Sequence, residues 1–410
     1  FNAEVYGYFQ NAREYGINCK QFALDWNAIQ SRKNRIVKKL TQGVEFLLKK
    51  NKVEIVHGRG RLAGGGKIVV STPKTREIES RSIILATGSE ARKLAGLEPD
   101  VRTVLTNKEA LAIKQAPESM VVLGGGAVGV EFASIFHRLG ARVTLIEMLP
   151  RVLPGEDEDV SAEIEKSLRK QGIAIHTQVK IESAAKTGKI VRVVFSVKGG
   201  AVERADAETL LVAIGRTPNT HDLGLEHTKI VTEGGFIKVN GAMQTDEPGV
   251  YAIGDIVAGS PMLAHVGEME GIVAATHAAG KAAEPVNYGQ APNCIYCEPE
   301  VASVGLTEKQ AREAGHKVRV GKFPFSANSK AAILGAREGF VKIVSEERYG
   351  EILGVHMIGP RVTEMIAEAV VAMRLEATAE DLAHAIHPHP TLTEAILEAA
   401  HAAHDWPIHI

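Results

Sequence analysis

Cysteine is scarce in this sequence, and its scarcity excludes a fold that depends on disulfides. Only Cys19, Cys294 and Cys297 occur in 410 residues, whereas small secreted domains held by disulfides are dense in cysteine. We therefore expect the chain to work in a reducing compartment. We take it to be the cytoplasm of a bacterium, with an organelle matrix as the alternative.

An excess of one charge and long apolar runs are missing as well. Lysine and arginine together number 48 against 49 aspartates and glutamates, which leaves a net charge of −1. Neither nucleic acid nor an anionic membrane is therefore an expected partner. No apolar run reaches the ~20 residues that a membrane helix needs. The apolar fraction of 45% is that of an ordinary globular protein, and the length suits two or three domains.

Glycine, by contrast, is abundant, with 40 residues, and its most informative cluster joins two apolar runs. The run 120–123 leads into a G-x-G-x-x-G turn at 124–129. A helical pattern then continues to Gly140, and a second apolar run, 143–146, ends on Glu147. This order of strand, glycine turn, helix, strand and acid is the dinucleotide-binding fingerprint.

Each glycine of the turn has a distinct expected task. Gly124 would allow the tight turn, Gly126 would let the backbone approach a pyrophosphate, and Gly129 would let helix and strand pack closely. The helix N-terminus offers free N–H groups and a partial positive charge to phosphates. Glu147 would accept hydrogen bonds from the ribose hydroxyls of the adenosine. The helical pattern has apolar residues at Val128, Phe132, Ile135, Phe136 and Leu139.

Three more apolar strands end in turns that suit ligands. The strand 82–86 ends in Thr87-Gly88-Ser89, the strand 209–214 ends at Gly215, and the strand 249–253 ends at Gly254-Asp255. Ligands of parallel sheets bind at such carboxyl ends. Asp255 either holds sugar hydroxyls or caps its own turn. The strand 82–86 has no obvious partner upstream, which is unusual for a parallel strand.

The remaining periodicity predicts two further kinds of region. A long amphipathic helix is predicted at 26–50, followed by short strands at 54–57, 67–71 and 76–79 around a turn at 64–66. After residue 292 the pattern is that of a separate α+β domain. Its predicted elements are strands 301–304, 318–323, 340–344 and 350–358 and a helix 362–375, whose methionine-rich stripe suits a core or a subunit interface.

A rigid histidine loop near the C-terminus is the acid–base candidate. Pro388 and Pro390 restrict the backbone on both sides of His389. One interpretation is structural, with Thr391 as helix N-cap and Glu394 completing a capping box. In the other, Glu394 orients the His389 imidazole, which suits proton transfer near neutral pH.

The pair Cys294-x-x-Cys297 matches the spacing of a redox motif or of half a zinc site. The pair does not open a helix after a strand, and no second pair completes a metal site. We therefore expect incidental structural cysteines and no metal.

Taken together, these motifs resemble those of the flavoprotein disulfide reductases, and most of all the branch that oxidises dihydrolipoamide. They occur in that family's order over nearly the whole chain. The motifs are Ala86-Thr87-Gly88-Ser89, the glycine turn 124–131, Ile214 to Asn219, Ala252 to Asp255, Met262 to His265, and His387 to Glu394.

The resemblance implies two cofactors and an acid–base pair. The residues implied to contact FAD are Gly58, Thr87, Gly88, Ser89, Asp255, Met262, Leu263, Ala264 and His265. Those implied to contact NAD are Gly124, Gly125, Gly126, Ala127, Val128, Gly129, Val130, Glu131, Glu147, Val179 and Gly215. His389 would exchange a proton with the dithiol, with Glu394 as its partner.

The fold class implied is α/β, with Rossmann-like FAD and NAD domains and a C-terminal α+β dimerisation domain. Residues 1–93 would be the remainder of the FAD domain, 94–219 the NAD domain, 220–285 a return to the FAD domain, and 286–410 the dimerisation domain. The family pattern starts with another glycine unit for FAD and a C-x-x-x-x-C redox disulfide. This chain starts in the helix after them, so we expect an incomplete FAD domain that binds FAD weakly and aggregates.

The resemblance also implies the reaction and its partners. Dihydrolipoamide would reduce the disulfide, and electrons would pass through FAD to NAD. The expected partners are a second copy of the chain and the lipoyl domain of a 2-oxo acid dehydrogenase complex. Alternatives stay open: a glutathione reductase, disfavoured by Glu147; a mercuric reductase, disfavoured by a tail 404–410 without cysteine; a transhydrogenase; or an inactive remnant.

Overall fold

The computed structural model describes residues 1–71, 74–197 and 200–410. They form two compact units. The first unit consists of residues 1–26, 92–215 and 289–410, and the second of residues 27–91 and 216–288. The assignment of separate segments to FAD and NAD stays a proposal. Among the described residues, no helix is long and apolar enough to cross a membrane.

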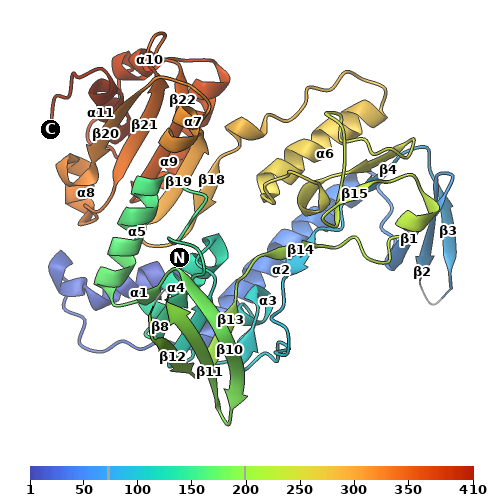
Figure 1. The fold of residues 1–410 in the computed structure, drawn as a ribbon, viewed down its shortest axis with the longest axis horizontal. Coiled ribbons are helices and arrows are strands. Elements are labelled where there is room, and N and C mark those ends of the chain that lie inside the picture. The colour runs from blue at the N-terminus through green and yellow to red at the C-terminus, as the bar shows by residue number, and fades with distance from the viewer. Residues whose placement is uncertain (72–73, 198–199) are drawn as a thin grey trace. The chain divides into compact units, whose positions relative to one another are not determined.

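The first unit contains a five-stranded parallel sheet (Figure 1). Its strands, in spatial order, are β6 (Val104–Leu105), β13 (Thr209–Val212), β7 (Ser119–Leu123), β8 (Arg142–Ile146) and β9 (Ala174–His176). The helices that connect them are α3 (Asn107–Ala110), α4 (Ala127–Arg138) and α5 (Glu158–Gln171). Val121 and Val122 of the central β7 point to opposite faces and are both buried, because a parallel sheet is covered on both faces.

Helix α4 packs closely on this sheet through small residues. Gly129 and Ala133 are buried together with Phe132 and Phe136, as the periodicity predicts for the phenylalanines. Ile135, however, is 37% exposed. The buried face of α4 thus includes the two small residues, which let the helix axis approach the strands.

Two smaller pieces complete this part of the first unit. An antiparallel sheet is formed by β10 (Val179–Thr187), β11 (Ile190–Val197) and β12 (Val202–Ala207). The N-terminal α1 (Asn2–Gln10) is followed by the short η1 (Ala12–Tyr15), which ends at Gly16. Trp26 donates a hydrogen bond to the Ile113 carbonyl and stacks on Phe136.

The C-terminal part of the first unit is a five-stranded antiparallel sheet with helices, which confirms the predicted α+β character (Figure 1). Its strands in spatial order are β18 (Asn293–Ile295), β19 (Glu300–Gly305), β22 (Ile352–Gly359), β21 (Phe340–Glu346) and β20 (Val318–Pro324). Its helices are α7 (Glu308–Glu313), α8 (Ser329–Leu334), α9 (Val362–Arg374), α10 (Ala379–His384) and α11 (Glu394–Ala403). The methionines of α9, Met365 and Met373, lie in this domain's own core.

The second unit contains short sheets and two long helices. Its sheets are β1 (Arg59–Gly64) with β2 (Lys67–Ser71) and β3 (Arg76–Glu79), β4 (Ile83–Leu85) with β17 (Val250–Ala252), β5 (Ser89–Ala91) with β14 (Arg216–Pro218), and β15 (Thr232–Glu233) with β16 (Phe236–Ile237). Its helices are α2 (Trp26–Lys50) and α6 (Ala264–Ala278). The strand predicted at 54–57 is irregular instead. The glycine turn after β1 pairs residues 59–64 with β2, because a hairpin joins the residues next to its turn.

Helix α2 has the predicted bounds, but none of its described residues is buried. Leu40, Val44 and Leu47 on its apolar face are 67%, 58% and 54% exposed. Strand β4 has β17 as its single partner among the described strands, which agrees with the expected lack of partners. Ile84 in β4 is 39% exposed.

Candidate functional site

The glycine turn after β7 has the geometry that the fingerprint requires. Gly124 has a φ of +105°, and a Cβ placed on it would lie 2.3 Å from the Ala213 carbonyl oxygen. A Cβ on Gly129 would lie 1.8 Å from the Gly124 carbonyl oxygen. A Cβ on Gly126, by contrast, would meet no atom within 4 Å. Two glycines are therefore required for packing, and the third leaves space in front of the N-terminus of α4.

Glu147, at the end of β8, is buried and braces this turn. Its carboxylate accepts one hydrogen bond from the Gly125 N–H at 2.5 Å and another from the Leu149 N–H at 2.7 Å. The Val179 N–H at the start of β10 donates to the Glu147 carbonyl at 3.2 Å. Each carboxylate oxygen keeps a further lone pair, so Glu147 can still accept from ribose hydroxyls.

The other fingerprint positions differ in their surroundings. Ala127 and Val128 are half-buried in the first turn of α4, whereas Val130 is fully buried in the core. Glu131 accepts a hydrogen bond from the Tyr296 N–H at 2.9 Å, and burial raises the pKa of its carboxyl. Gly215 is exposed after β13 with a φ of +111°. The structure therefore brings Gly124 to Gly126 and Glu147 together and places Val130 in the core.

In the second unit, Ser89 and Asp255 form a hydrogen-bonded pair that Arg216 completes. The Ser89 hydroxyl donates to Asp255 at 2.5 Å and accepts from the Arg216 Nε at 2.5 Å. The Arg216 guanidinium also lies 3.6 Å from the Asp255 carboxylate. Asp255 therefore reaches across to another strand end and does not cap its own turn. The sequence did not single out Arg216, although it lies in the motif 214–219. Strands β5 and β14 are more than 120 residues apart, so a local motif does not indicate that they pair.

The neighbouring turn is held by Asn219. The Thr87 hydroxyl donates to the Asn219 carbonyl at 2.8 Å, and the Asn219 side-chain amide donates to the Thr87 carbonyl at 3.0 Å. The Asn219 N–H donates to the Gly88 carbonyl at 2.9 Å. Thr87, Gly88 and Ser89 are thus fixed next to the carboxyl end of β4.

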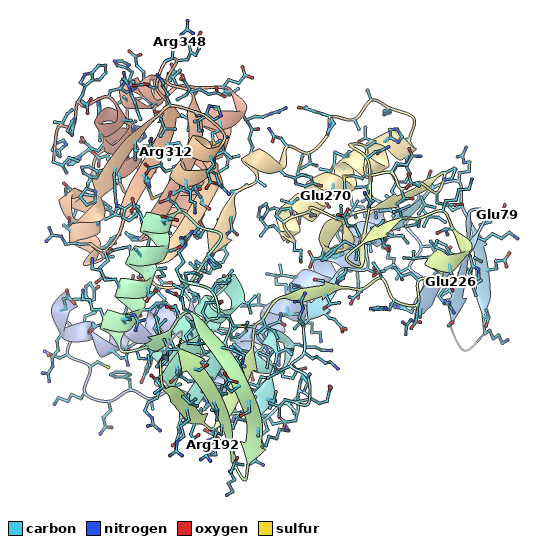
Figure 2. The ribbon with its side chains drawn as sticks, viewed as in Figure 1. Glu79, Arg192, Glu226, Glu270, Arg312 and Arg348 are labelled. Carbon is cyan, nitrogen blue, oxygen red and sulfur yellow. The ribbon has the colours of Figure 1, made fainter. Side chains whose placement is uncertain are left out.

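The turn before α6 and the N-terminal turns of this unit are more open. Met262 and Leu263 are half-buried, and Ala264 and His265 are exposed in the first turn of α6. Gly58 is exposed just before β1. Deeper in the unit, Glu270 of α6 is fully buried (Figure 2). Its carboxylate accepts from the Gly254 N–H at 2.5 Å and from the Tyr288 hydroxyl at 2.7 Å, which fixes the turn that carries Asp255.

The loop 385–393 between α10 and α11 presents His389 on the surface of the first unit. Its Nδ1 lies 2.9 Å from the Glu394 carboxylate, and the two side chains are 68% and 22% exposed. The Glu394 carboxylate also accepts from the Thr391 N–H at 2.8 Å. Asn328, which the sequence did not single out, donates to the Thr391 carbonyl at 3.0 Å.

Of the capping box that the structural interpretation expected, one half is present, the hydrogen bond from the Thr391 N–H to Glu394, and the half that needs the Thr391 hydroxyl as acceptor is missing. Helix α11 begins at Glu394 with Thr393 as N-cap, and the Thr391 hydroxyl donates to the Pro388 carbonyl instead. Partial burial alone would raise the pKa of the Glu394 carboxyl, but the Thr391 N–H and the imidazole of His389 outweigh it and lower that pKa. Glu394 is therefore an anion that orients His389.

The cysteines lie apart from this loop. All three are free. Cys294 is on β18, and Cys297 is buried in the core beneath α4. Burial raises the pKa of the Cys294 thiol to about 11 and raises that of Cys297 further, so neither is an activated thiolate. Among the described residues, no group of three or more His, Cys, Asp or Glu could hold a metal ion.

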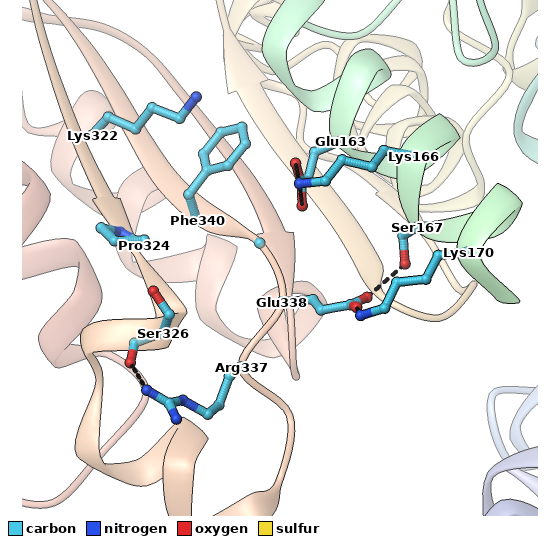
Figure 3. Close-up of a pocket in the computed structure, with 11 residues that line it drawn as sticks. Glu163, Lys166, Ser167, Lys170, Lys322, Pro324, Ser326, Arg337, Glu338 and Phe340 are labelled. Atoms are coloured by element: carbon cyan, nitrogen blue, oxygen red, sulfur yellow. Dashed lines mark hydrogen bonds and ion pairs between the residues drawn. The ribbon is translucent and has the colours of Figure 1, made fainter.

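A surface hollow of about 600 Å³ lies between α5 and the C-terminal sheet (Figure 3). Lys170 pairs with Glu338, Lys166 pairs with Glu163, and Arg337 donates to the Ser326 carbonyl at 2.6 Å. Because its charges are already paired, and because neither the glycine turn nor His389 lines it, we assign it no role.

Comparisons with known proteins agree with this geometry. Residues 10–271 match the pyridine nucleotide-disulphide oxidoreductase model, and residues 291–400 match the dimerisation domain of the same family. The chain is 44% identical to the dihydrolipoyl dehydrogenase of Bacillus subtilis, covering 100% of this chain and 88% of the relative. It is 39% identical to the mitochondrial dihydrolipoyl dehydrogenase of Pisum sativum, covering 97% and 79%.

Solved structures show the same fold. LpdA from Mycobacterium tuberculosis superposes with a TM-score of 0.90 at 27% identity, covering 97% of this chain and 87% of that one. The HOCl-induced flavoprotein disulfide reductase RclA from Escherichia coli gives a TM-score of 0.82 at 25% identity, covering 91% and 85%. The α/β fold and the C-terminal dimerisation domain are thereby confirmed, and FAD and NAD are the cofactors of this enzyme family. The chain belongs to the pyridine nucleotide-disulphide oxidoreductase family.

Proposed function

We propose that this chain performs the NAD-linked oxidation of dihydrolipoamide, the activity for which its curated relatives are named. The observation that carries the proposal is the contact of 2.9 Å between His389 Nδ1 and the Glu394 carboxylate. Oxidation of a dithiol to a disulfide releases two electrons and two protons, so the site needs a group that takes a proton near neutral pH. Imidazole is the side chain suited to that task.

The pair fixes the tautomer of the imidazole. Because the Glu394 carboxylate is an acceptor, the His389 Nδ1 carries the hydrogen and donates it. The Nε2 lone pair is then available on a ring that is 68% exposed. His389 therefore accepts a thiol proton at Nε2, while Glu394 orients the ring through Nδ1.

The turn after β7 suits NAD, which supplies the hydride acceptor of the reaction. The open space at Gly126 and the N-terminal amides of α4 fit a pyrophosphate, and Glu147 fits the ribose hydroxyls. Gly124, Gly125, Ala127, Val128, Gly129 and Gly215 would shape this site, and Val130, Glu131 and Val179 would support it from behind.

The second unit suits FAD, which supplies the electron relay between the dithiol and NAD. Asp255 keeps acceptor capacity for ribityl hydroxyls beyond its bond to Ser89. Thr87, Gly88, Met262 to His265 and Gly58 would surround it. Exposed positions at a strand end and a helix N-terminus are what a bound cofactor would cover.

The partners follow from the same assignment. The match of residues 291–400 to a dimerisation domain supports a homodimer. We propose that His389 acts on the disulfide of the second subunit, and that the lipoyl domain of a 2-oxo acid dehydrogenase complex delivers the dithiol. We assign the reaction to the bacterial cytoplasm, in keeping with three free cysteines.

The test is a comparison of substrates with the flavin-loaded holoenzyme. Dihydrolipoamide with NAD should give NADH at a kcat/KM at least a hundredfold above that with reduced glutathione, which corresponds to about 2.7 kcal/mol. Equal rates with glutathione, or no NADH formation from dihydrolipoamide by a protein that carries flavin, would contradict the proposal.

A further inference from the structure

His387, two residues before the acid–base histidine, is held more tightly than His389 itself. Its side chain is only 6% exposed. The Nε2 atom lies 2.8 Å from the Glu368 carboxylate on α9, and the Nδ1 atom lies 3.0 Å from the Ala385 carbonyl oxygen. Both ring nitrogens therefore face an oxygen.

The chemistry of the two partners determines the protonation of this ring. A carbonyl oxygen and an ionised carboxylate can only accept hydrogen bonds. Both nitrogens of His387 must then donate, and an imidazole with two N–H groups is an imidazolium cation. The hydrogen bond to Glu368 is the largest cause that raises the pKa of His387 above its ordinary value; burial opposes it, and Ala385 and Glu394 add smaller contributions in the same direction as Glu368. The geometry and the titration of the ring thus agree.

The imidazolium of His387 connects the loop that carries His389 to helix α9. Helix α9 is anchored in the core of the C-terminal domain through Met365 and Ile366, so Glu368 offers a fixed point. The charge of His387 also acts on Glu394, since it lowers the pKa of that carboxyl. Glu368 from α9 and Glu394 from α11 are the carboxylates that act on the ring.

We propose that His387 is a positioning residue, an imidazolium that fastens the loop 385–391 to Glu368 of α9 and thereby holds His389 in place. The inference rests on the proposed function. His387 fixes the position of the His389 ring, and so the direction in which that ring faces the reacting thiol.

The first test is the dihydrolipoamide reaction of the holoenzyme. His387→Ala and Glu368→Ala should each lower kcat about ten- to hundredfold, because a displacement near 1 Å of a catalytic group costs that much. KM for NAD and the transfer of electrons from NADH to a dye should stay within twofold. Glu364→Ala, on the same helix one turn earlier, is the matched control and should leave kcat unchanged.

The pH profile separates positioning from a general loss of structure. In Glu368→Gln the amide oxygen can still accept from Nε2, but the negative charge is gone, so the pKa of His387 falls toward its ordinary value near 6.5. The ratio of variant to wild-type kcat should be near one below that pH, where His387 is charged in both. It should fall about three- to tenfold by pH 8, where only the wild-type ring stays charged. His387→Gln should show a loss that does not depend on pH.

Two results would overturn the proposal. One is an unchanged kcat in His387→Ala. The other, which holds even if the alanine variants do not fold, is a Glu368→Gln ratio that is flat with pH. If the wild-type protein does not oxidise dihydrolipoamide, the proposed function fails, and ¹⁵N NMR of the histidine rings decides the inference alone. Two protonated nitrogens on His387 at neutral pH support it, and a neutral ring refutes it.

Discussion

The glycine turn after β7 and the loop before α11 each present a candidate functional group, but different parts of the chain build them. The turn is made by the backbone: Gly124 and Gly129 meet carbonyl oxygens so closely that no side chain fits. The loop is made by side chains: Glu394 and Glu368 hold one histidine each. The geometry of the glycine turn therefore depends on the space left at a few backbone positions. The geometry of the histidine loop depends on the charges of its side chains.

This contrast has consequences for how each region fails. A methyl group at a packed glycine disturbs the fold itself, whereas an isosteric change in the loop removes a proton-transfer group and leaves the fold intact. The two regions should therefore separate in experiments that measure stability and activity in the same variant.

The largest expected effect comes from the loop. His389→Gln removes the proton acceptor and should lower dihydrolipoamide oxidation by about 10²–10⁴-fold. Transfer from NADH to a dye needs no thiol proton and should survive. Glu394→Gln should show the same selectivity with a smaller loss, since it removes the carboxylate that orients His389 at 2.9 Å. Equal losses in both assays would mean that the loop is merely structural.

A mixed dimer tests in which subunit His389 acts. One subunit carries His389→Gln, and the other lacks the redox cysteine pair that the family resemblance implies. Action across the interface predicts one working site of the two, formed by the cysteines of the first subunit and His389 of the second. Action within one subunit predicts no working site.

The contrast also explains which features the sequence predicted. The roles of Gly124 and Gly129 were predictable because steric limits act between near neighbours in a βαβ unit. The N-cap at Thr391 was not predictable in the same way: Glu394 does accept from the Thr391 N–H, but the Thr391 hydroxyl donates to the Pro388 carbonyl and the helix starts later, at Glu394. The local sequence pattern fits both a capping box at Thr391 and a pairing of Glu394 with His389, so it could not decide between these two structures.

Contacts between residues far apart in the sequence could not be predicted from it. Arg216 meets Ser89, and Glu368 meets His387, through tertiary packing that no spacing rule describes. The strand predicted at 54–57 failed for a related reason, since the turn at 64–66 selects residues 59–64 for pairing. The elements with strong periodicity, such as α2 at 26–50, were predicted to the residue.

The next effect is in the glycine turn. Gly129→Ala places a methyl group 1.8 Å from the Gly124 carbonyl oxygen, which should cost about 3 kcal/mol and lower Tm by roughly 5–10 °C. Gly126→Ala is the matched control for packing, because its Cβ meets nothing within 4 Å. Its Tm should be unchanged, yet NAD should bind about tenfold more weakly because the methyl group occupies the pyrophosphate space. Calorimetry and NAD titration of both variants distinguish packing from binding.

A smaller effect is expected at Glu147. The carboxylate should repel the 2′-phosphate of NADP, so NAD should be preferred by at least about tenfold, or 1.4 kcal/mol. Glu147→Arg should narrow that preference, and it should also weaken NAD binding because the Gly125 N–H loses its acceptor. Met148→Arg places a positive charge at an exposed neighbouring position and keeps the hydrogen bond from the Gly125 N–H to Glu147. It should therefore narrow the preference for NAD over NADP less than Glu147→Arg does. Equal turnover with NADP in the unmodified holoenzyme would refute the assignment of Glu147.

The smallest effect is expected at the cysteines that pack near α4. Cys297 lies in the core beneath that helix and donates to the Pro299 carbonyl at 3.0 Å, and serine can keep that hydrogen bond. The raised pKa of each thiol leaves no reactive thiolate at neutral pH. Replacing both Cys294 and Cys297 by serine should therefore leave kcat for dihydrolipoamide within about twofold and lower Tm by only a few degrees, since a buried hydroxyl replaces a buried thiol. A complete loss of lipoamide activity with a normal Tm would instead make the pair part of the reaction, and the histidine loop would no longer be the single thiol-handling region of this chain.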